Sequence, residues 1–149
     1  MERVTYRLVA TGIIKKGNKV LISLKGSEPR PIRNQWYFPG GNVEAGENPF
    51  YSVLREIKEE TGLRVKVLRV IDFFPEFRDF NPWKFKGWMM HIVFECEYTS
   101  GKPFAKDDIV QVKWASKKEI LEYTRKNSHT RLAKFLKNSK NLKSFFQRI

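Results

Sequence analysis

Alternation of hydrophobic and polar residues marks the strands that we expect in this chain. The clearest case is residues 88–98, where every second side chain is hydrophobic and would share one face of a sheet. That face would carry Trp88, Met90, Ile92, Phe94, Cys96 and Tyr98, and the other would carry Met89, His91, Val93, Glu95 and Glu97. Shorter hydrophobic runs predict strands at residues 4–14, 19–24, 36–38, 63–73 and 111–115.

A helical period replaces this alternation in residues 49–61. At about 100° per residue, one apolar stripe is formed by Phe50, Val53, Leu54 and Ile57. Asn48 suits the N-cap and Pro49 the first helical position, where a missing N–H is no loss. Gly62 can end the helix in the left-handed conformation. The sequence therefore predicts a helix of about 13 residues between these caps.

The last third of the chain predicts more helix. Ser116 and Glu119 have the spacing of a capping box, which would open a helix running to about residue 125. One further helix is expected from about residue 128, with Leu132, Phe135 and Leu136 as its apolar stripe. Strands before and after a central helix, followed by terminal helices, favour an α/β fold with a mixed sheet covered on both faces. With 149 residues, we expect residues 1–149 to form a single domain.

Residues 73–88 are difficult to place because they combine many aromatic side chains with two prolines. Pro75 and Pro82 argue against one regular element across this segment, so we expect a long loop. Its aromatic residues, including Phe77, could stack on a nucleobase. Packing of the loop on the core and a homodimer surface are the alternatives, and together they are preferred.

The net charge of +13 is concentrated near the C-terminus. Residues 117–149 hold ten Lys or Arg against two acids, Glu119 and Glu122, which gives +8 for this basic helical segment. Such a surface could hold RNA or attract phosphorylated substrates. A solvent-exposed basic tail is the preferred explanation, because clustered charge alone carries no sequence readout. No hydrophobic run is long enough to span a membrane, and the single cysteine, Cys96, is consistent with a cytoplasmic protein.

Three glutamates crowd the end of the predicted central helix. Glu56, Glu59 and Glu60 fall within roughly a quarter of the helix circumference, beside the apolar stripe. Glu56 and Glu60 form a like-charge pair at i,i+4, and the negative end of the helix dipole adds to the repulsion. Arg55 can pair with Glu59, but no basic residue stands three or four positions before Glu60. A solvated acidic helix end is the plain explanation, whereas Mg²⁺ or Mn²⁺ would relieve the repulsion.

The residues around this helix resemble the Nudix box of the MutT-like Nudix hydrolase family. That pattern is Gly-x5-Glu-x7-Arg-Glu-(aliphatic)-x-Glu-Glu-x-Gly-(aliphatic), and residues 41–63 match all nine fixed positions. These positions are Gly41, Glu47, Arg55, Glu56, Ile57, Glu59, Glu60, Gly62 and Leu63. Agreement at nine places in 23 residues is far more specific than a lone glycine motif. The resemblance implies a Nudix-type α/β/α sandwich.

The resemblance also implies an activity and roles for named residues. It implies hydrolysis of the pyrophosphate bond of a nucleoside di- or triphosphate derivative by water attack on phosphorus, with Mg²⁺ or Mn²⁺ as cofactor. Glu56 and Glu60 would bind the metal directly, Glu59 directly or through water, and the carbonyl of Gly40 would complete the site. Arg55 would orient the glutamates. A non-catalytic nucleotide-binding module is the weaker alternative, because such members usually lose box residues.

The general base and the substrate-binding residues are less well defined. By the resemblance, the base is a box glutamate or an acid on a later loop, for which Asp108 is the candidate and Glu95 or Glu97 the alternatives. Loop arginines that could clamp phosphates are Arg30 and Arg33. We also consider Phe77 and His91 as substrate contacts, although a structural histidine is the commoner case. The alternative substrate is the 5′ end of an RNA held by the basic C-terminal segment.

Overall fold

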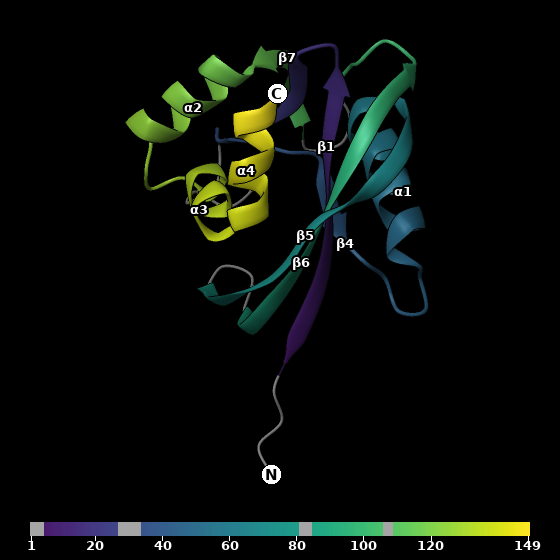
Figure 1. Ribbon diagram of the computed structural model, residues 1–149. Helices are drawn as coiled ribbons and strands as arrows, with labels where there is room; N and C mark the ends of the chain where they lie inside the picture. The colour runs from purple at the N-terminus through teal and green to yellow at the C-terminus, as the bar shows by residue number, and fades with distance from the viewer. Residues whose placement is uncertain (1–4, 27–33, 81–84, 106–108) are drawn as a thin grey trace.

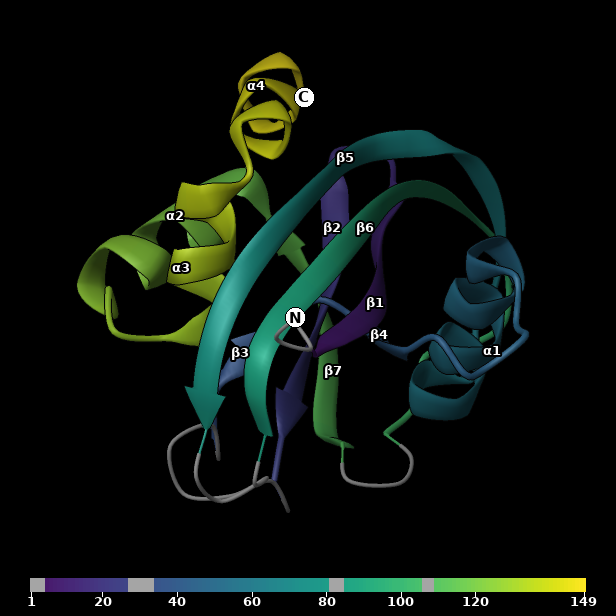
Figure 2. The ribbon, with the colours of Figure 1, turned by 90° about the horizontal axis from the view of Figure 1, so that it is seen from below.

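The structure is a computed structural model that describes residues 5–26, 34–80, 85–105 and 109–149. A seven-stranded mixed sheet lies between two layers of helices (Figures 1 and 2). Its strands are β1 (Tyr6–Lys16), β2 (Lys19–Lys25), β3 (Trp36–Tyr37), β4 (Gly40–Asn42), β5 (Arg64–Phe80), β6 (Phe85–Ser100) and β7 (Ile109–Ser116). The helices are α1 (Pro49–Thr61), α2 (Lys117–Lys126), α3 (Arg131–Asn138) and α4 (Lys140–Arg148). The expected α/β/α sandwich is therefore confirmed.

The order of the strands explains why the sheet is mixed. The main path runs β3-β2-β1-β6-β5, with β4 paired to β1 and β7 paired to β2. The long central pair, β1 and β6, is parallel, whereas the other pairs are antiparallel. Both faces of the sheet are apolar because each supports its own core. None of the described helices is long and apolar enough to cross a membrane.

Two hydrophobic clusters hold the helices to opposite faces of the sheet. On one face, Val53 and Ile57 of α1 pack with Phe94 and Cys96 of β6. On the other face, α2, α3 and α4 contribute Ile120, Leu132, Leu136 and Phe146 to a cluster with Val93 of β6. The alternation expected for β6 is therefore confirmed, with both of its faces contributing to a core.

The central helix begins and ends where its caps predicted. Asn48 Oδ1 accepts a hydrogen bond from the Phe50 N–H at 3.0 Å, and Pro49 is the first helical residue. Gly62 lies at φ 76°, and its N–H donates to the carbonyl of Lys58 at 2.9 Å. Only two residues separate α1 from strand β5, and this short connection fixes the direction of α1 relative to the sheet.

The expectation of an irregular segment at residues 73–88 is wrong for most of its length. Strand β5 continues through Pro75 to Phe80, and β6 begins at Phe85, so the two form one long antiparallel pair. Pro75 is tolerated because β5 is the edge strand of the sheet, where a residue without an N–H need not break the ladder. Sequence alone did not show that this strand lies at the edge.

The C-terminal segment also differs from the prediction. The capping box at Ser116 and Glu119 is present and opens α2. The single further helix is in fact two, α3 and α4, joined at Ser139. The Ser139 hydroxyl accepts a bond from the Leu142 N–H at 3.2 Å and donates to Asp72 of β5 at 2.7 Å. This cap allows the chain to turn sharply, so that α4 packs on the sheet.

Candidate active site

Helix α1 brings its glutamates to strand β4 because it packs closely on β1. A Cβ on Gly12 of β1 would lie 2.8 Å from Ile57 Cδ1 and 3.3 Å from Val53 Cγ2, so a larger residue would force these buried side chains to shift. Val53 and Ile57 are both fully buried against the sheet. Glu56 and Glu60 lie beside this buried stripe, as the helical spacing predicted, and they contact Gly41 and Gly40 of β4.

Arg55 holds the carboxylates of this region in place. Its guanidinium donates to Glu47 at 2.8 and 3.0 Å, to Glu56 at 3.0 Å and to Glu59 at 3.2 Å. The hydrogen bonds to Arg55, with one from the Ser52 hydroxyl, lower the pKa of Glu47 to about 2. In return, the bonds to Glu47 raise the pKa of Arg55. Arg55 is therefore a fixed positive charge shared among three carboxylates, rather than the partner of Glu59 alone.

Glu56 occupies a position that only a glycine neighbour allows. A Cβ on Gly41 would lie 2.6 and 2.7 Å from the two carboxylate oxygens of Glu56, so a larger residue would push the carboxylate away. The Glu56 side chain is 17% exposed. Burial raises its pKa above the usual value, and the Arg55 guanidinium only partly offsets this effect. The ionised carboxylate would therefore gain from an additional cation.

Glu60 is more buried and corrects one expectation from the sequence. It was expected to lack a cationic partner, yet the Nζ of Lys25 on β2 lies 4.0 Å from its Oε1. The N–H of Gly40 also donates to Glu60 Oε2 at 3.4 Å. The helix-based argument missed Lys25 because this residue is 35 positions away in sequence and reaches Glu60 only through the fold.

The donor set fits a hard divalent cation, but its side chains are held by protein contacts. Glu56, Glu59 and Glu60 provide carboxylate oxygens only, which suits Mg²⁺ or Mn²⁺. Among the described residues, no group of three or more acidic, cysteine or histidine side chains converges on one point. Glu59 is half exposed and its carboxylate turns toward Arg55. Binding a cation therefore requires these carboxylates to rotate away from Arg55 and Lys25, while the backbone of β4 stays in place.

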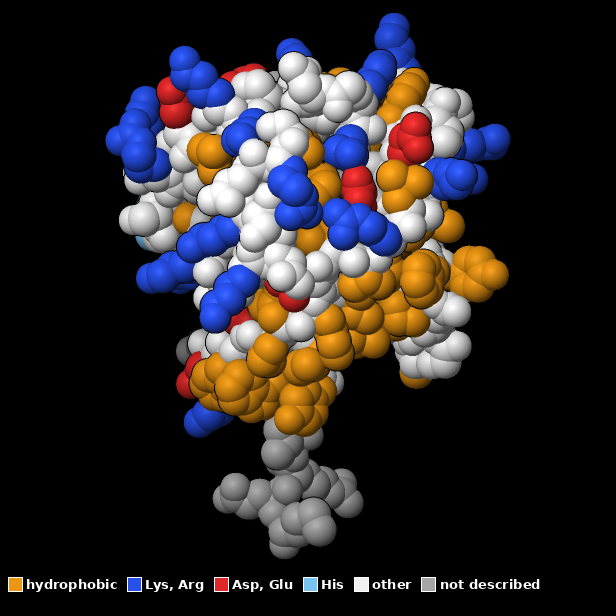
Figure 3. Space-filling model, viewed as in Figure 1, with side chains coloured by type: hydrophobic (Ala, Val, Ile, Leu, Met, Phe, Trp, Pro, Cys, Tyr) orange, Lys and Arg blue, Asp and Glu red, His pale blue; other side chains and the backbone are white. Residues whose placement is uncertain are grey.

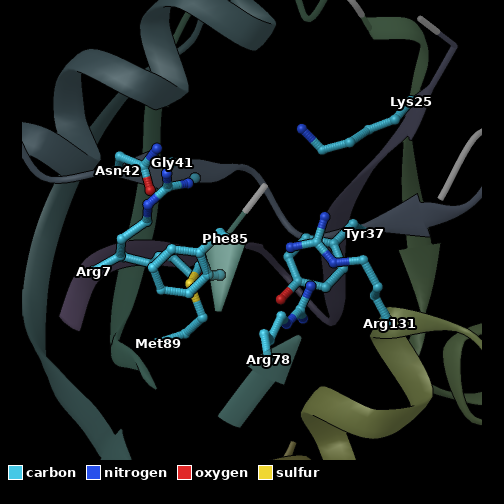
Figure 4. Close-up of a pocket in the computed structure, with 12 residues that line it drawn as sticks. Arg7, Lys25, Tyr37, Gly41, Asn42, Arg78, Phe85, Met89 and Arg131 are labelled. Carbon is cyan, nitrogen blue, oxygen red and sulfur yellow. The ribbon is translucent and has the colours of Figure 1, made fainter. Parts of the chain in front are cut away.

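A cavity of about 410 Å³ opens next to the Gly40–Gly41 strand (Figure 4). It is lined by Arg7, Val9, Thr11, Lys25, Tyr37, Gly40, Gly41, Asn42, Arg78, Phe85, Met89 and Arg131. In Figure 4, Arg7, Phe85 and Met89 lie on one side of the cavity, and Tyr37, Arg78 and Arg131 on the other. Four basic side chains thus surround one space that also touches the strand contacted by the carboxylates.

The walls of the cavity combine cations with aromatic rings and buried hydroxyls. The Arg131 guanidinium lies 4.7 Å from the Tyr37 ring centre, and that of Arg7 lies 4.3 Å from the Phe85 ring centre. Thr11 is fully buried, and its Oγ1 has no hydrogen-bond partner among the residues described. A buried hydroxyl without a partner is costly, so Thr11 marks a place where a ligand could accept or donate a hydrogen bond.

Apart from Gly40 and Gly41, the sequence did not point to the residues that line this cavity. Arg7, Arg78 and Arg131 belong to β1, β5 and α3, and each looks like an ordinary surface cation in its own segment. Only Tyr37 could have been singled out, since it stands in the aromatic run just before the glycine turn. The predicted phosphate-binding residues Arg30 and Arg33, and the general-base candidate Asp108, lie outside the described residues.

The other predicted contacts lie away from the cavity. Phe77 is exposed on the face of β5 opposite to Arg78, with its ring against Trp88. His91 is fully buried and donates from Nε2 to Glu76 at 3.0 Å, while its ring stacks on Phe74. Neither residue lines the cavity.

The acids considered as alternative bases are also placed elsewhere. Glu95 is buried and bonded to Lys15 at 2.9 Å and Arg69 at 2.7 Å, and it does not line the cavity. Its pKa is lowered because these two cations outweigh the effect of burial. Glu97 is exposed near the far end of β6. Of the predicted site acids that lie in the described residues, Glu56 and Glu60 are the ones that contact residues lining the cavity.

Comparison with protein families places this arrangement among known proteins. The model described as "NUDIX domain" matches residues 5–138. An ADP-ribose pyrophosphatase of Methanocaldococcus jannaschii is 38% identical over 97 residues, which cover 65% of this chain and 54% of that protein. An 8-oxo-dGTP diphosphatase of Buchnera aphidicola is 39% identical over 72 residues, covering 46% of this chain and 55% of that protein. The chain thus spans about half the length of these curated relatives.

Solved structures show the same fold at lower sequence identity. A NUDIX hydrolase from Nitrosomonas europaea superposes with a TM-score of 0.74 at 18% identity, covering 94% of this chain and 90% of that one. A MutT protein from Methanosarcina mazei Go1 gives a TM-score of 0.68 at 20% identity, covering 82% and 85%. The fold of this chain is therefore shared with solved proteins.

Proposed function

The chain belongs to the NUDIX family, and from this premise we propose that it hydrolyses the pyrophosphate bond of a nucleotide derivative. The reaction would be attack of water on a phosphorus atom of a nucleoside di- or triphosphate, or of a nucleotide sugar. The observation that carries the proposal is the contact of Glu56 and Glu60 with Gly41 and Gly40, which also line the cavity. A pyrophosphate at that end of the cavity would lie beside the carboxylates.

We assign the metal-binding role to Glu56, Glu60 and Glu59, with the carbonyl of Gly40. A bound Mg²⁺ or Mn²⁺ would neutralise phosphate charge and lower the pKa of the attacking water. Arg55 positions the carboxylates through its bonds to Glu47, Glu56 and Glu59, so it acts through them and need not touch the substrate. A carboxylate of the same group would also take the proton of the attacking water, since Glu56 and Glu60 contact the strand that lines the cavity.

The cavity would bind the rest of the substrate. Tyr37, Phe85 and Met89 offer an apolar surface for a base or sugar, and the surrounding cations suit phosphates. The relatives named above act on different nucleotides, an ADP-ribose in one case and an 8-oxo-dGTP in the other. Both compounds carry a purine and a chain of phosphates, which fits this combination of apolar and cationic walls.

The proposal is tested by replacing the carboxylates without changing their shape. Glu56→Gln and Glu60→Gln should each lower turnover by about 100-fold or more with Mg²⁺ or Mn²⁺, because losing even outer-shell groups of a metal site costs 10–100-fold. Glu122→Gln is the matched control, since Glu122 is an exposed carboxylate on α2, in the opposite layer. ADP-ribose, 8-oxo-dGTP and the common nucleoside triphosphates form the panel, and ¹⁸O-water identifies the attacked phosphorus. Full activity in both variants would reject the assignment.

A second candidate substrate, the 5′ end of an RNA, is favoured by one observation. A groove of about 680 Å³ between α2, α3 and α4 is edged by Lys117, Arg125, Lys134, Lys137 and Lys143. No described carboxylate lies within ion-pair distance of Arg125, Lys134, Lys137 or Lys143. A phosphate backbone leaving the cavity could follow these cations across α3.

The two substrates can be separated by reversing charge in the groove. Lys134→Glu combined with Lys137→Glu should reduce turnover of a 5′-triphosphorylated RNA and flatten its salt dependence, while leaving a free nucleotide unaffected. Lys66→Glu, an exposed lysine on β5, is the control. Equal rates on RNA for the parent and the double variant would leave the free nucleotide as the substrate.

A further inference from the structure

On the sheet face covered by α1, strands β1, β6 and β5 carry mainly apolar side chains, but α1 covers only part of this face. Strands β1, β6 and β5 place residues directly opposite one another in rows across this face. From the end nearest the N-terminus, the first three rows are Tyr6-Trp88-Phe77, Leu8-Met90-Pro75 and Ala10-Ile92-Phe73. We call these nine residues the open rows, although in the third row only Phe73 is exposed, because Ala10 is fully buried and Ile92 packs against the cluster under α1. The next rows lie under α1, where Ile57 approaches Gly12 and Phe50 contacts Phe94.

The open rows leave large aromatic side chains in contact with solvent. Tyr6 is 59% exposed, Phe73 58%, Phe77 52% and Trp88 37%. Figure 3 shows hydrophobic side chains gathered over the end of the molecule where β5 and β6 lie, while Lys and Arg gather at the opposite end. A contiguous apolar patch of this kind on one protein usually marks a contact with another.

The amino-acid pattern shows that this face is built to be apolar. Strand β5 changes register between Val67 and Arg69 and between Val70 and Asp72. Each shift of register would exchange the two faces of the strand, and the two together restore the alternation. As a result Phe73, Pro75 and Phe77 all point to the open side, while Phe74 points to the core under α3.

We propose that the open rows bind the same face of a second copy of this chain, forming a two-fold symmetric homodimer. The chain carries a net charge of +13, so two copies repel each other wherever lysine and arginine face one another. The open rows contain no charged residue at any of their nine positions. They therefore offer a surface on which two copies can meet without bringing like charges together.

The exposed area is sufficient for such a dimer. Four aromatic side chains of about 200 Å² each, roughly half exposed, offer about 400 Å². The remaining members of the rows raise this to about 600 Å² per copy, so a pair would bury about 1,200 Å² in total, at the lower end of specific interfaces. A symmetric contact needs only this one self-complementary patch. We therefore expect a dimer in the micromolar range rather than a permanent one.

Dimer formation would also support the cavity, because the same strands line it from their other face. Arg7, Arg78 and Met89 line the cavity, and each is the chain neighbour of an open-row residue, namely Tyr6, Phe77 and Trp88. Fixing the open rows against a second copy would hold these strand ends and the side chains they supply. The dimer should therefore bind substrate more tightly than the monomer. This last consequence rests on the proposed hydrolysis, whereas the dimer itself does not.

Sedimentation equilibrium of the intact chain tests the dimer. The parent protein should sediment at twice the 17.7 kDa mass of one chain at about 50 µM and dissociate on dilution. Phe77→Lys should weaken association at least about tenfold, since each copy would bring a lysine charge into the apolar contact. Leu121→Lys is the control, because Leu121 is a similarly exposed hydrophobic residue on α2, in the opposite layer. The Leu121→Lys variant should remain dimeric.

Three results would overturn the proposal. They are a parent protein that is monomeric at this concentration, a Phe77→Lys variant that is still dimeric, and a dimer that Leu121→Lys disrupts. If Phe77→Lys does not unfold cooperatively, Phe73→Lys on the same edge strand provides the same test. If the dimer supports the cavity, the KM of the parent protein should rise on dilution. The Phe77→Lys variant should have this higher KM at every protein concentration.

Discussion

Two partly buried ionic networks in this protein shift the pKa of a central glutamate in opposite directions. At the end of α1, Glu47, Glu56 and Glu59 share Arg55, and burial leaves the pKa of Glu56 above its usual value. On the β5–β6 pair, Glu76 Oε1 accepts bonds from Arg78 at 2.8 Å and from His91 at 3.0 Å. Burial works to raise the pKa of Glu76, but these bonds outweigh it and hold the pKa at about 2.

This difference distinguishes a network that a bound cation would stabilise from a network whose carboxylate is already satisfied by protein donors. The α1 network has more carboxylates than cations, so an added divalent ion would stabilise it. The Glu76 network satisfies its carboxylate with protein donors, and it also fixes Arg78 at the wall of the cavity. Excess negative charge is therefore tolerated where the proposed chemistry occurs, while balanced charge positions Arg78, which we propose as a substrate contact.

The largest expected effect comes from replacing one glutamate by glutamine in each network. Glu56→Gln should lower turnover by about 100-fold or more yet leave the free energy of unfolding unchanged or slightly higher, because the ionised form is disfavoured by burial. Glu76→Gln should do the reverse, losing about 3 kcal/mol of stability while keeping kcat and raising KM. Urea unfolding and steady-state kinetics on both variants measure the contrast. Similar losses of stability in the two would show that the networks do not differ.

The next largest effect should be a loss of folding stability at low pH, caused by protonation of Glu76. The pKa of this carboxyl is about 2 in the folded protein, against a usual value of 4.5. Its contribution is therefore complete above about pH 4.5 and is lost as the pH falls toward 2, which amounts to about 3 kcal/mol. The stability of the parent protein should fall more steeply in this window than that of Glu76→Gln. Glu47 and Glu95 also have lowered pKa values, but both variants share them, so their effects cancel. Parallel unfolding curves from pH 6 to pH 2.5 would contradict this prediction.

The two networks also differ in how far the sequence predicted them. Asn48, Pro49 and Gly62 define α1 through contacts within a few residues, so its limits and its row of glutamates followed from spacing alone. The pair between Arg55 and Glu59 is likewise local. Lys25 could not be predicted as the neighbour of Glu60, because only the position of β2 beside α1 brings it within 4.0 Å.

The cavity is wholly a product of tertiary structure. Arg7, Arg78 and Arg131 lie in β1, β5 and α3, and the parallel register of β1 with β6 is needed to bring the first two together. Pro75 misled the prediction because a proline argues against a strand unless the strand is known to be at an edge. Local caps and spacing thus predicted where the glutamates of α1 lie, whereas the cavity that we propose binds substrate depends on pairings between distant strands.

Arg55→Lys should show a smaller effect and would sharpen the role of the α1 network. Lysine keeps the positive charge, but it cannot bond to Glu47, Glu56 and Glu59 together as the planar guanidinium does. We expect turnover to fall about tenfold, and the Mg²⁺ concentration for half activity to rise, because a group that positions metal ligands typically contributes 10–100-fold. Arg69→Lys, which changes a half-exposed arginine bonded only to Glu95, is the control. Equal Mg²⁺ titrations for Arg55→Lys and the parent would limit Arg55 to a structural role.

Thr11→Val should produce the smallest effect. It tests whether the buried Thr11 hydroxyl bonds to the substrate. Thr11 is fully buried on the wall of the cavity, and its hydroxyl has no partner in the described part of the chain. Valine has nearly the same shape, so the substitution removes only a buried polar group. If the hydroxyl bonds to substrate, KM should rise a few-fold, roughly the effect of about 1 kcal/mol. The ligand-free protein should at the same time become more stable, by up to about 1 kcal/mol, because an unsatisfied hydroxyl is costly to bury. A stability loss with unchanged KM would mean that the hydroxyl serves the fold, and that the need for a ligand is confined to the carboxylates of α1.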